Sequence, residues 1–171
     1  MKLNVYGLNK ALNKVKKGGN WISIRDRYTN DETNEKYACM DRRIPRYGCR
    51  SMTIYFDDID PYRFYHDMEH PMIKVKFADP SHEPVFFGPE HVKEIMDFVS
   101  PLWEQDHDVE INIHCWAGKS RSQAVAYYLN IYFNLMLDHD VDAFIENNQR
   151  NITDKIHFNC EVLKVFSQVC G

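Results

Sequence analysis

The chain has 171 residues, of which 44% are hydrophobic and 27% are charged, and its formal net charge at pH 7 is −4. This length and composition predict one soluble globular domain, residues 1–171, without repeats or low-complexity segments. The weakly acidic charge excludes a general attraction to nucleic acid or to an anionic membrane, but it leaves room for a local basic pocket.

Two further properties of the sequence concern location and redox state. No segment reaches the roughly 18 to 20 apolar residues that a membrane span needs, and the first residues lack a secretory signal pattern. We therefore expect a cytoplasmic protein. The odd number of cysteines and the lack of a CxxC pair fit reduced thiols better than disulfides or a zinc site. The cysteines are Cys39, Cys49, Cys115, Cys160 and Cys170.

In chain order, the first part of the sequence alternates between strand and helix patterns. Short apolar runs predict strands at 2–6, 20–26 and 51–60. Between the first two runs, apolar residues follow a helical spacing that stops at Gly18-Gly19. The polar segment 27–50 has no clear period, and we expect it to form a long loop.

The second part of the sequence continues this alternation. Strands are predicted at 72–77 and 109–115, and Gly88 followed by Pro89 is typical of a helix start. Four helices are predicted: 88–103, 120–137, 141–148 after Asp140, and 160–169 after Asn159. The helix at 120–137 is apolar nearly all round and should be buried. Strands alternating with helices indicate an α/β sheet covered by helices.

A tight loop between the strand at 109–115 and the next helix is the strongest functional signal. It runs from Cys115 to Arg121, and its alanine and glycine allow the backbone to aim several N–H groups at one point. The N-terminus of the next helix adds its positive dipole end there. Such surroundings favour a thiolate, so the sequence predicts a nucleophilic cysteine beside an anion site suited to a phosphoryl group.

The residues next to this cysteine fit the same chemistry. Arg121 carries a planar guanidinium that can hold two phosphate oxygens at once, a geometry that lysine lacks. His114 can orient the loop or bond to backbone behind it. Ser122 can donate a hydroxyl to the sulfur and help it leave a phosphocysteine.

The segment "HCWAGKSRS", residues 114–122, resembles the HCx5R(S/T) signature of the cysteine-dependent protein tyrosine phosphatases. It is most similar to the dual-specificity group, especially small bacterial and phage-type members, which also have strands like "WISI" and "FDDI". The resemblance implies a mostly parallel four- or five-stranded sheet flanked by helices. It also implies a two-step reaction through phosphocysteine, with no metal and no cofactor. The phosphate-binding residues would be Trp116, Ala117, Gly118, Lys119, Ser120 and Arg121.

Three other interpretations of Cys115 compete with this one. A lone cysteine is usually a buried structural residue. The "AGKS" segment suggests an ATP-binding loop, but that motif requires a glycine where this chain has Ile113. A rhodanese-like sulfurtransferase also uses a loop cysteine, although the preceding His114 and the following "SRS" favour a phosphatase.

The general acid is less clearly indicated. Hydrolysis of a phosphate ester needs a proton for the leaving oxygen, and the family takes it from an aspartate on a loop before the signature. The resemblance to small bacterial members favours "FDDI", with Asp58 ahead of Asp57. Spacing in better-known members favours Asp79. We expect Asp58, with Asp79 and Asp57 as alternatives, although a strand-end aspartate is often only a turn former or a helix cap.

These observations predict a phosphomonoester hydrolase, a cysteine-dependent tyrosine or dual-specificity phosphatase. Its expected partner is a protein carrying phosphotyrosine or phosphoserine/threonine, or another phosphomonoester, and no nucleic-acid partner is expected. Two alternatives stay open: a catalytically weak phosphate-binding module, and a phosphatase for inositol lipids or RNA 5′-phosphates. Lys119 motivates the second alternative, because it resembles the "AGK" lysine of inositol-lipid phosphatases, but it can equally be an exposed rim lysine.

Overall fold

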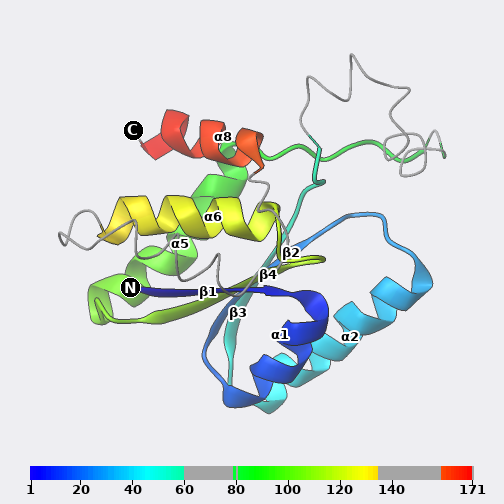
Figure 1. Ribbon diagram of the computed structural model, residues 1–171, viewed down its shortest axis with the longest axis horizontal. Coiled ribbons are helices and arrows are strands. Elements are labelled where there is room, and N and C mark those ends of the chain that lie inside the picture. The colour runs from blue at the N-terminus through cyan, green and yellow to red at the C-terminus, as the bar shows by residue number, and fades with distance from the viewer. Residues whose placement is uncertain (60–78, 80, 135–158, 171) are drawn as a thin grey trace.

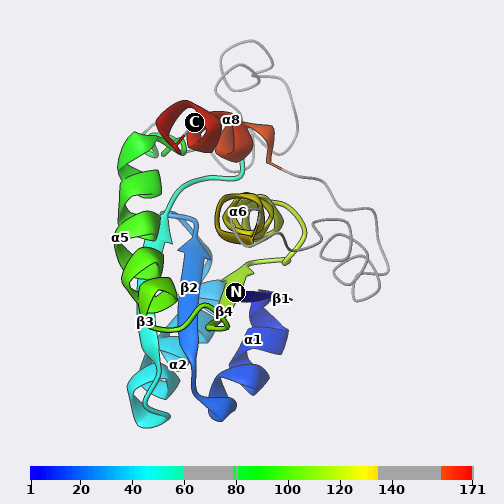
Figure 2. The ribbon, with the colours of Figure 1, turned by 90° about the vertical axis from the view of Figure 1, so that its left-hand side faces the viewer.

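The computed structural model describes residues 1–59, 79, 81–134 and 159–170 (Figure 1). Its sheet has four strands in the order β1-β4-β2-β3, and every neighbouring pair is parallel. The strands are β1 (Lys2–Gly7), β2 (Asn20–Arg25), β3 (Arg50–Tyr55) and β4 (Glu110–Cys115). Figure 2 shows them side by side, with β3 and β1 at the two edges. The predicted α/β class with a mostly parallel sheet is confirmed.

Helices cover both faces of this sheet. They are α1 (Leu8–Lys14), α2 (Asp31–Arg46), α5 (Pro89–Gln105), α6 (Arg121–Leu129) and α8 (Cys160–Cys170). A short 3-10 turn (Val15–Lys17) continues α1, and a π-helical turn (Asn130–Asn134) continues α6. In Figure 1, α5, α6 and α8 lie above the strands, whereas α1 and α2 lie below them. The result is a three-layer α/β/α sandwich.

The alternation of side chains along β2 explains why two separate cores form. Ile22 and Ile24 join the larger apolar cluster with residues of α5, α6 and α8. Trp21, one residue out of phase, joins the smaller cluster with α1 and α2. Successive strand residues point to opposite faces, so one strand, buried from Trp21 to Arg25, supplies both cores.

The prediction that 27–50 forms a loop is wrong, because α2 occupies Asp31–Arg46. Asn30 caps this helix by accepting a 2.9 Å hydrogen bond from the Thr33 N–H. Its buried face, Thr33, Tyr37, Met40 and Ile44, follows a helical spacing but contains few aliphatic residues. The intervening positions are so polar that the amphipathic pattern is hidden in the sequence.

Most other predicted elements that can be compared are confirmed. Gly88 precedes the first turn of α5, where Pro89 stands, and Asn159 caps α8 by accepting a 3.1 Å hydrogen bond from the Val162 N–H. The predicted strand at 72–77 and the predicted helix at 141–148 lie outside the described residues. Within the described segments, none of the helices is long and apolar enough to cross a membrane.

Candidate active site

The loop between β4 and α6 rests on the junction between β1 and α1. The Leu8 N–H donates a 3.0 Å hydrogen bond to the Trp116 carbonyl oxygen. Gly118 has a φ of +74°, and a Cβ there would lie 2.4 Å from the backbone nitrogen of Gly7. Only glycine tolerates both the left-handed backbone and this close approach. The neighbouring strand therefore determines the shape of the loop.

Cys115 ends β4 with its sulfur turned toward the following helix. The side chain is buried, at 2% exposure. Its Sγ accepts a hydrogen bond from the Gly118 N–H at 3.2 Å and lies 3.1 Å from the Ser122 Oγ. The sulfur therefore lies within hydrogen-bond distance of one amide donor and one hydroxyl, and close to the N-terminus of α6, a position that favours a bound anion.

Arg121 is the first residue of α6 and is 3% exposed. Its Nη1 donates to Asp26 Oδ1 at 3.1 Å and to the Phe56 carbonyl oxygen at 2.8 Å, and its Nη2 donates to Asp26 Oδ2 at 3.1 Å. A guanidinium has five N–H donors. Among the described residues, the Nε donor has no hydrogen-bond partner. The edge formed by Nε and Nη2 thus retains two parallel donors, which match two oxygens of a phosphate.

Asp26 is a site residue that the sequence analysis missed. It follows β2 directly, and its side chain is 13% exposed beside Arg121. Burial by itself would lower the pKa of Arg121, but the charges of Asp26 and Cys115 raise that pKa above its ordinary value. A carboxylate at the end of a strand next to β4 was the available signal, because carboxyl ends of parallel strands share one edge.

Asp58, the expected general acid, lies at the loop. Its Oδ1 accepts hydrogen bonds from the Ser120 Oγ at 2.7 Å and from the Asn159 Nδ2 at 2.9 Å. Its Oδ2 is 3.9 Å from the Nε of Arg121, and the side chain is 35% exposed. This carboxyl group therefore faces the phosphate-matching edge of the guanidinium and remains accessible to a substrate.

The two alternative acids have other surroundings. Asp57 is fully buried, and its Oδ2 accepts a 2.9 Å hydrogen bond from the Val85 N–H. Asp79 is exposed, and its Oδ1 accepts from the Ser81 N–H at 2.9 Å and from the Ser81 Oγ at 2.7 Å. These hydrogen bonds lower the pKa of Asp79 and so disfavour the protonated form that a general acid needs.

Asn159 is a second residue whose part in the site was not predicted. The sequence identified it only as a helix cap, and its Oδ1 does cap α8. Its Nδ2 simultaneously holds Asp58, so α8 helps to orient that carboxylate. No local signal links these two residues, because they lie on segments far apart in the chain.

The rim of the loop differs in exposure from its base. Trp116 is 41% exposed. The Nζ of Lys36 in α2 lies 5.2 Å from the centroid of its ring, so a cation–π contact joins the loop to α2. Ala117 is also exposed, while Lys119 and Ser120 are half-buried. Gln123 is buried behind the loop and donates a 3.0 Å hydrogen bond to the Gly118 carbonyl oxygen.

His114 lies beneath the loop, on the α1 and α2 face of the sheet. It is fully buried, and its ring centroid is 6.4 Å from the Trp21 ring in an edge-on arrangement. Burial, together with the positive charge of Arg25, lowers the pKa of His114 to about 3. The imidazole is therefore neutral at neutral pH and packs as an uncharged support for the loop.

This lowered pKa predicts a pH-dependent stability. The unfolded chain binds a proton at His114 below about pH 6.5, whereas the folded chain does not until about pH 3. The free energy of unfolding should therefore fall as pH drops through this window, with a contribution of up to about 1.4 kcal/mol per pH unit. Urea unfolding of the wild type and His114→Gln checks this, and equal slopes in the two proteins would contradict it.

The three-layer architecture and the strand–loop–helix around Cys115 define the fold of the cysteine-dependent protein tyrosine phosphatases. The solved structure of Tk-PTP in its active form is similar over 99% of this chain and 91% of that chain, with a TM-score of 0.53 and 10% identity. The solved structure of PTPMT1 is similar over 98% of this chain and 88% of that chain, with a TM-score of 0.53 and 15% identity. No protein-family model and no curated protein matches the sequence. The likeness to solved structures confirms the predicted fold.

Proposed function

We propose that this chain is a phosphomonoester hydrolase that acts through a phosphocysteine intermediate, on phosphotyrosine and on phosphoserine/threonine in proteins. The observation that supports this most is the surroundings of one buried sulfur. Cys115 Sγ has an amide and a hydroxyl directed at it, and Arg121 offers an unused pair of parallel donors at the same loop.

In the first step, the Cys115 thiolate attacks phosphorus, so that an S–P bond forms and the P–O ester bond breaks. The equatorial oxygens are held by the loop N–H groups and by the Nε and Nη2 edge of Arg121. Asp58 in its protonated form gives its proton to the leaving oxygen. In the second step, water gives a proton to the Asp58 carboxylate and attacks phosphorus, and the sulfur leaves as a thiolate that Ser122 and the Gly118 amide stabilise.

The role of Asp58 leads to a prediction about pH and leaving group. Asp58→Asn should lower kcat by about 10²-fold and remove the alkaline limb of its pH profile, because that limb records loss of the donated proton. The loss should be smaller for p-nitrophenyl phosphate than for phenyl phosphate, since p-nitrophenolate leaves more easily without a proton. Steady-state rates across the pH range for both substrates measure this.

Asp79→Asn is the matched control for that experiment, because Asp79 is an exposed aspartate on the alternative loop. It should keep the wild-type profile with both substrates. If Asp79→Asn loses the alkaline limb and Asp58→Asn retains it, the assignment of the acid is wrong while the hydrolase proposal stands.

A panel of substrates distinguishes the proposed activity from its alternatives. The proposal expects turnover of phosphotyrosine and phosphothreonine peptides. Turnover confined to an inositol lipid or to an RNA 5′-phosphate would replace the protein substrate with one of these. Tight binding of phosphopeptides without turnover, unaffected by Asp58→Asn, would identify a phosphate-binding module instead.

A further inference from the structure

A groove of about 530 Å³ lies between α1 and α2, and the proposed reaction makes no use of it. Most of its lining comes from one face of α2, where the residues recur at a helical spacing. The lining residues are Glu35, Lys36, Ala38, Cys39 and Arg42 of α2, with Leu12 of α1. Arg43 joins the two helices, since its Nη1 donates a hydrogen bond to the Leu12 carbonyl oxygen. The groove therefore offers both apolar and charged side chains to a ligand.

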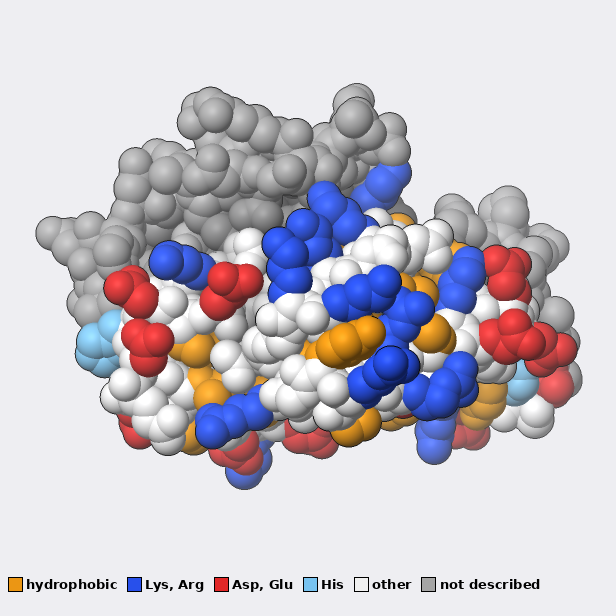
Figure 3. Space-filling view, turned by 90° about the horizontal axis from the view of Figure 1, so that it is seen from below, with side chains coloured by type: hydrophobic (Ala, Val, Ile, Leu, Met, Phe, Trp, Pro, Cys, Tyr) orange, Lys and Arg blue, Asp and Glu red, His pale blue; other side chains and the backbone are white. Residues whose placement is uncertain are grey.

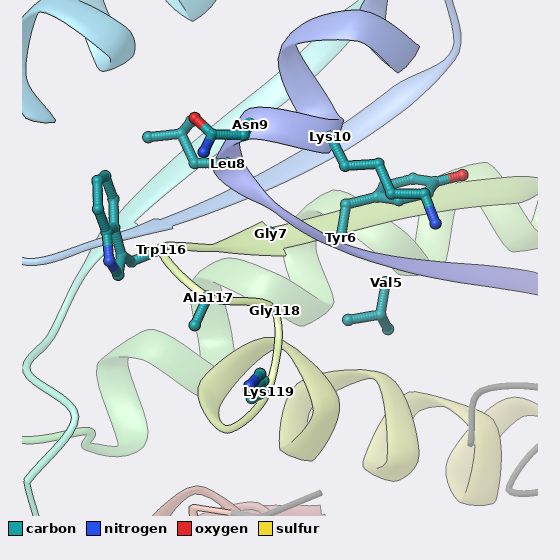
Figure 4. Close-up of a pocket in the computed structure, with 10 residues that line it drawn as sticks. All are labelled: Val5, Tyr6, Gly7, Leu8, Asn9, Lys10, Trp116, Ala117, Gly118 and Lys119. Carbon is teal, nitrogen blue, oxygen red and sulfur yellow. The ribbon is translucent and has the colours of Figure 1, made fainter. Parts of the chain in front are cut away.

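One end of this groove adjoins the rim of the loop. Lys36 lines the groove, and its Nζ lies 5.2 Å from the ring centroid of Trp116, which directly follows Cys115. The hydrogen bond from the Leu8 N–H fixes the backbone of Trp116 against the start of α1. Figure 4 shows the Trp116 side chain on the side of the loop where α1 begins. A polypeptide bound at Cys115 can therefore continue over Trp116 and Lys36 into the groove.

The other end of the groove carries exposed cations. Arg42 is exposed, and Arg46 is exposed one helical turn farther along the same face of α2. On α1, the exposed Lys16 directly follows Val15. The Val15 carbonyl oxygen accepts a 3.6 Å hydrogen bond from the Cys49 thiol, so the ends of the two helical segments lie together. A ligand that leaves the groove at this end meets positive charge from both helices.

Segment 8–50, which forms α1, α2 and their connections, has an excess of positive charge. It contains eleven Lys and Arg against five Asp and Glu, although the whole chain has a net charge of −4. Three of the five carboxylates are held by cations: Asp26 by Arg121, Glu32 by Lys36 and Asp41 by Arg25. Outside these ion pairs, nine Lys and Arg of the segment face two carboxylates, Asp31 and Glu35. Figure 3, a view from the side of α1 and α2, shows Lys and Arg gathered on this face, which favours an anionic partner.

We propose that the groove between α1 and α2 binds an acidic segment of the protein substrate, and that Arg42 and Arg46 select substrates that carry such a segment. This inference rests on the proposed function, since it takes the phosphorylated residue to lie at Cys115. The part of α2 from Lys36 to Arg46 rises by about 15 Å, which an extended peptide covers in about five residues. We therefore expect the acidic residues to lie roughly three to eight positions from the phosphorylated residue.

The lining of the groove fits a polypeptide better than a nucleic acid. Leu12 and Ala38 offer apolar contacts that a row of phosphates cannot use. The Glu35 carboxylate lies between the loop and Arg42 along α2, and it would repel a backbone that carries one charge per nucleotide. A peptide can place an uncharged side chain at this position and its acidic side chains beyond it.

Binding of phosphotyrosine peptides to the Cys115→Ser protein, measured by calorimetry, tests the proposal without turnover. A peptide with a run of glutamates at the expected positions should bind about tenfold tighter than one with glutamines there, which corresponds to ~1.4 kcal/mol. One pair of peptides carries the run on the N-terminal side of the phosphotyrosine and a second pair on the C-terminal side, and one of the two pairs should show this preference. Added salt should reduce it, because the cations are exposed.

Substitutions then locate the surface that causes the preference. In the same background, Arg42→Ala combined with Arg46→Ala should bring the ratio of affinities close to one, and Arg42→Lys with Arg46→Lys should retain most of it. Lys93→Ala with Lys164→Ala is the matched control, since it removes two exposed cations from α5 and α8, across the sheet. It should keep the ratio. With Cys115 restored, the double alanine variant at Arg42 and Arg46 should hydrolyse p-nitrophenyl phosphate at the wild-type rate, which also shows that it is folded.

The outcomes separate this inference from the proposed function. Equal affinity for the glutamate and glutamine peptides of both pairs, or a preference that the alanine substitutions at Arg42 and Arg46 leave unchanged, overturns the docking surface and leaves the loop proposal intact. Failure of every phosphopeptide to bind overturns both. Binding of single-stranded RNA or of phosphatidylserine vesicles that depends on Arg42 and Arg46, without a preference for glutamate, overturns the assignment to an acidic polypeptide.

Discussion

Cys115→Ser should reduce the hydrolysis of p-nitrophenyl phosphate by roughly 10⁴-fold or more, because a serine hydroxyl is a much weaker nucleophile than a cysteine sulfur in the proposed mechanism. The loop amides and Arg121 are unchanged in this variant, so it should still bind a phosphotyrosine peptide. Acid-quenched wild type should carry one phosphoryl group on the peptide that contains Cys115, and the variant should carry none there. Initial rates, calorimetry and mass spectrometry measure these three properties.

Cys160→Ser is the control, because it makes the same substitution at an exposed cysteine at the start of α8. It should hydrolyse the substrate at the wild-type rate. Equal rates for wild type and Cys115→Ser, with both proteins folded, would show that the sulfur of Cys115 is not the nucleophile and would overturn the proposed mechanism.

Arg121→Lys should lower kcat/KM by about 10³-fold even though the positive charge remains, a loss of ~4 kcal/mol of transition-state stabilisation. A lysine ammonium cannot bind Asp26 in a bidentate manner and also present two parallel donors to phosphate. Inhibition by inorganic phosphate should weaken together with kcat/KM, because the same donors bind both ligands. Steady-state kinetics with and without phosphate measure the two effects.

Arg27→Lys is the matched control for this substitution, since Arg27 is exposed and lies outside the loop. It should remain close to wild type in both measurements. A variant Arg121→Lys that retains full kcat/KM would show that charge alone, and not the paired donors of the guanidinium, holds the phosphate.

Much of the fold could be predicted from local patterns. The four described strands have apolar runs, and α5 and α8 have regular apolar spacing and recognisable caps, so their type is determined by neighbouring residues. The helix α2 could not be predicted in this way. Its buried Tyr37 packs against Arg25, whose guanidinium centre is 4.7 Å from the ring centroid, and Arg25 is also held by Asp41. Such burial arises from contacts between distant segments, and local hydrophobicity does not reveal it.

The sequence by itself determined the loop, because a cysteine, a glycine turn and a guanidinium within seven consecutive residues constrain one another through the backbone alone. Only the tertiary structure decided which acids accompany them. Ser23 pairs with His114 and Arg25 pairs with Tyr55, and these registers bring Asp26 and Asp58 to the same edge of the sheet as Cys115. The surroundings of Asp58, which Ser120 and Asn159 hold beside Arg121, depend on strand register and helix packing, which no single segment of the chain encodes.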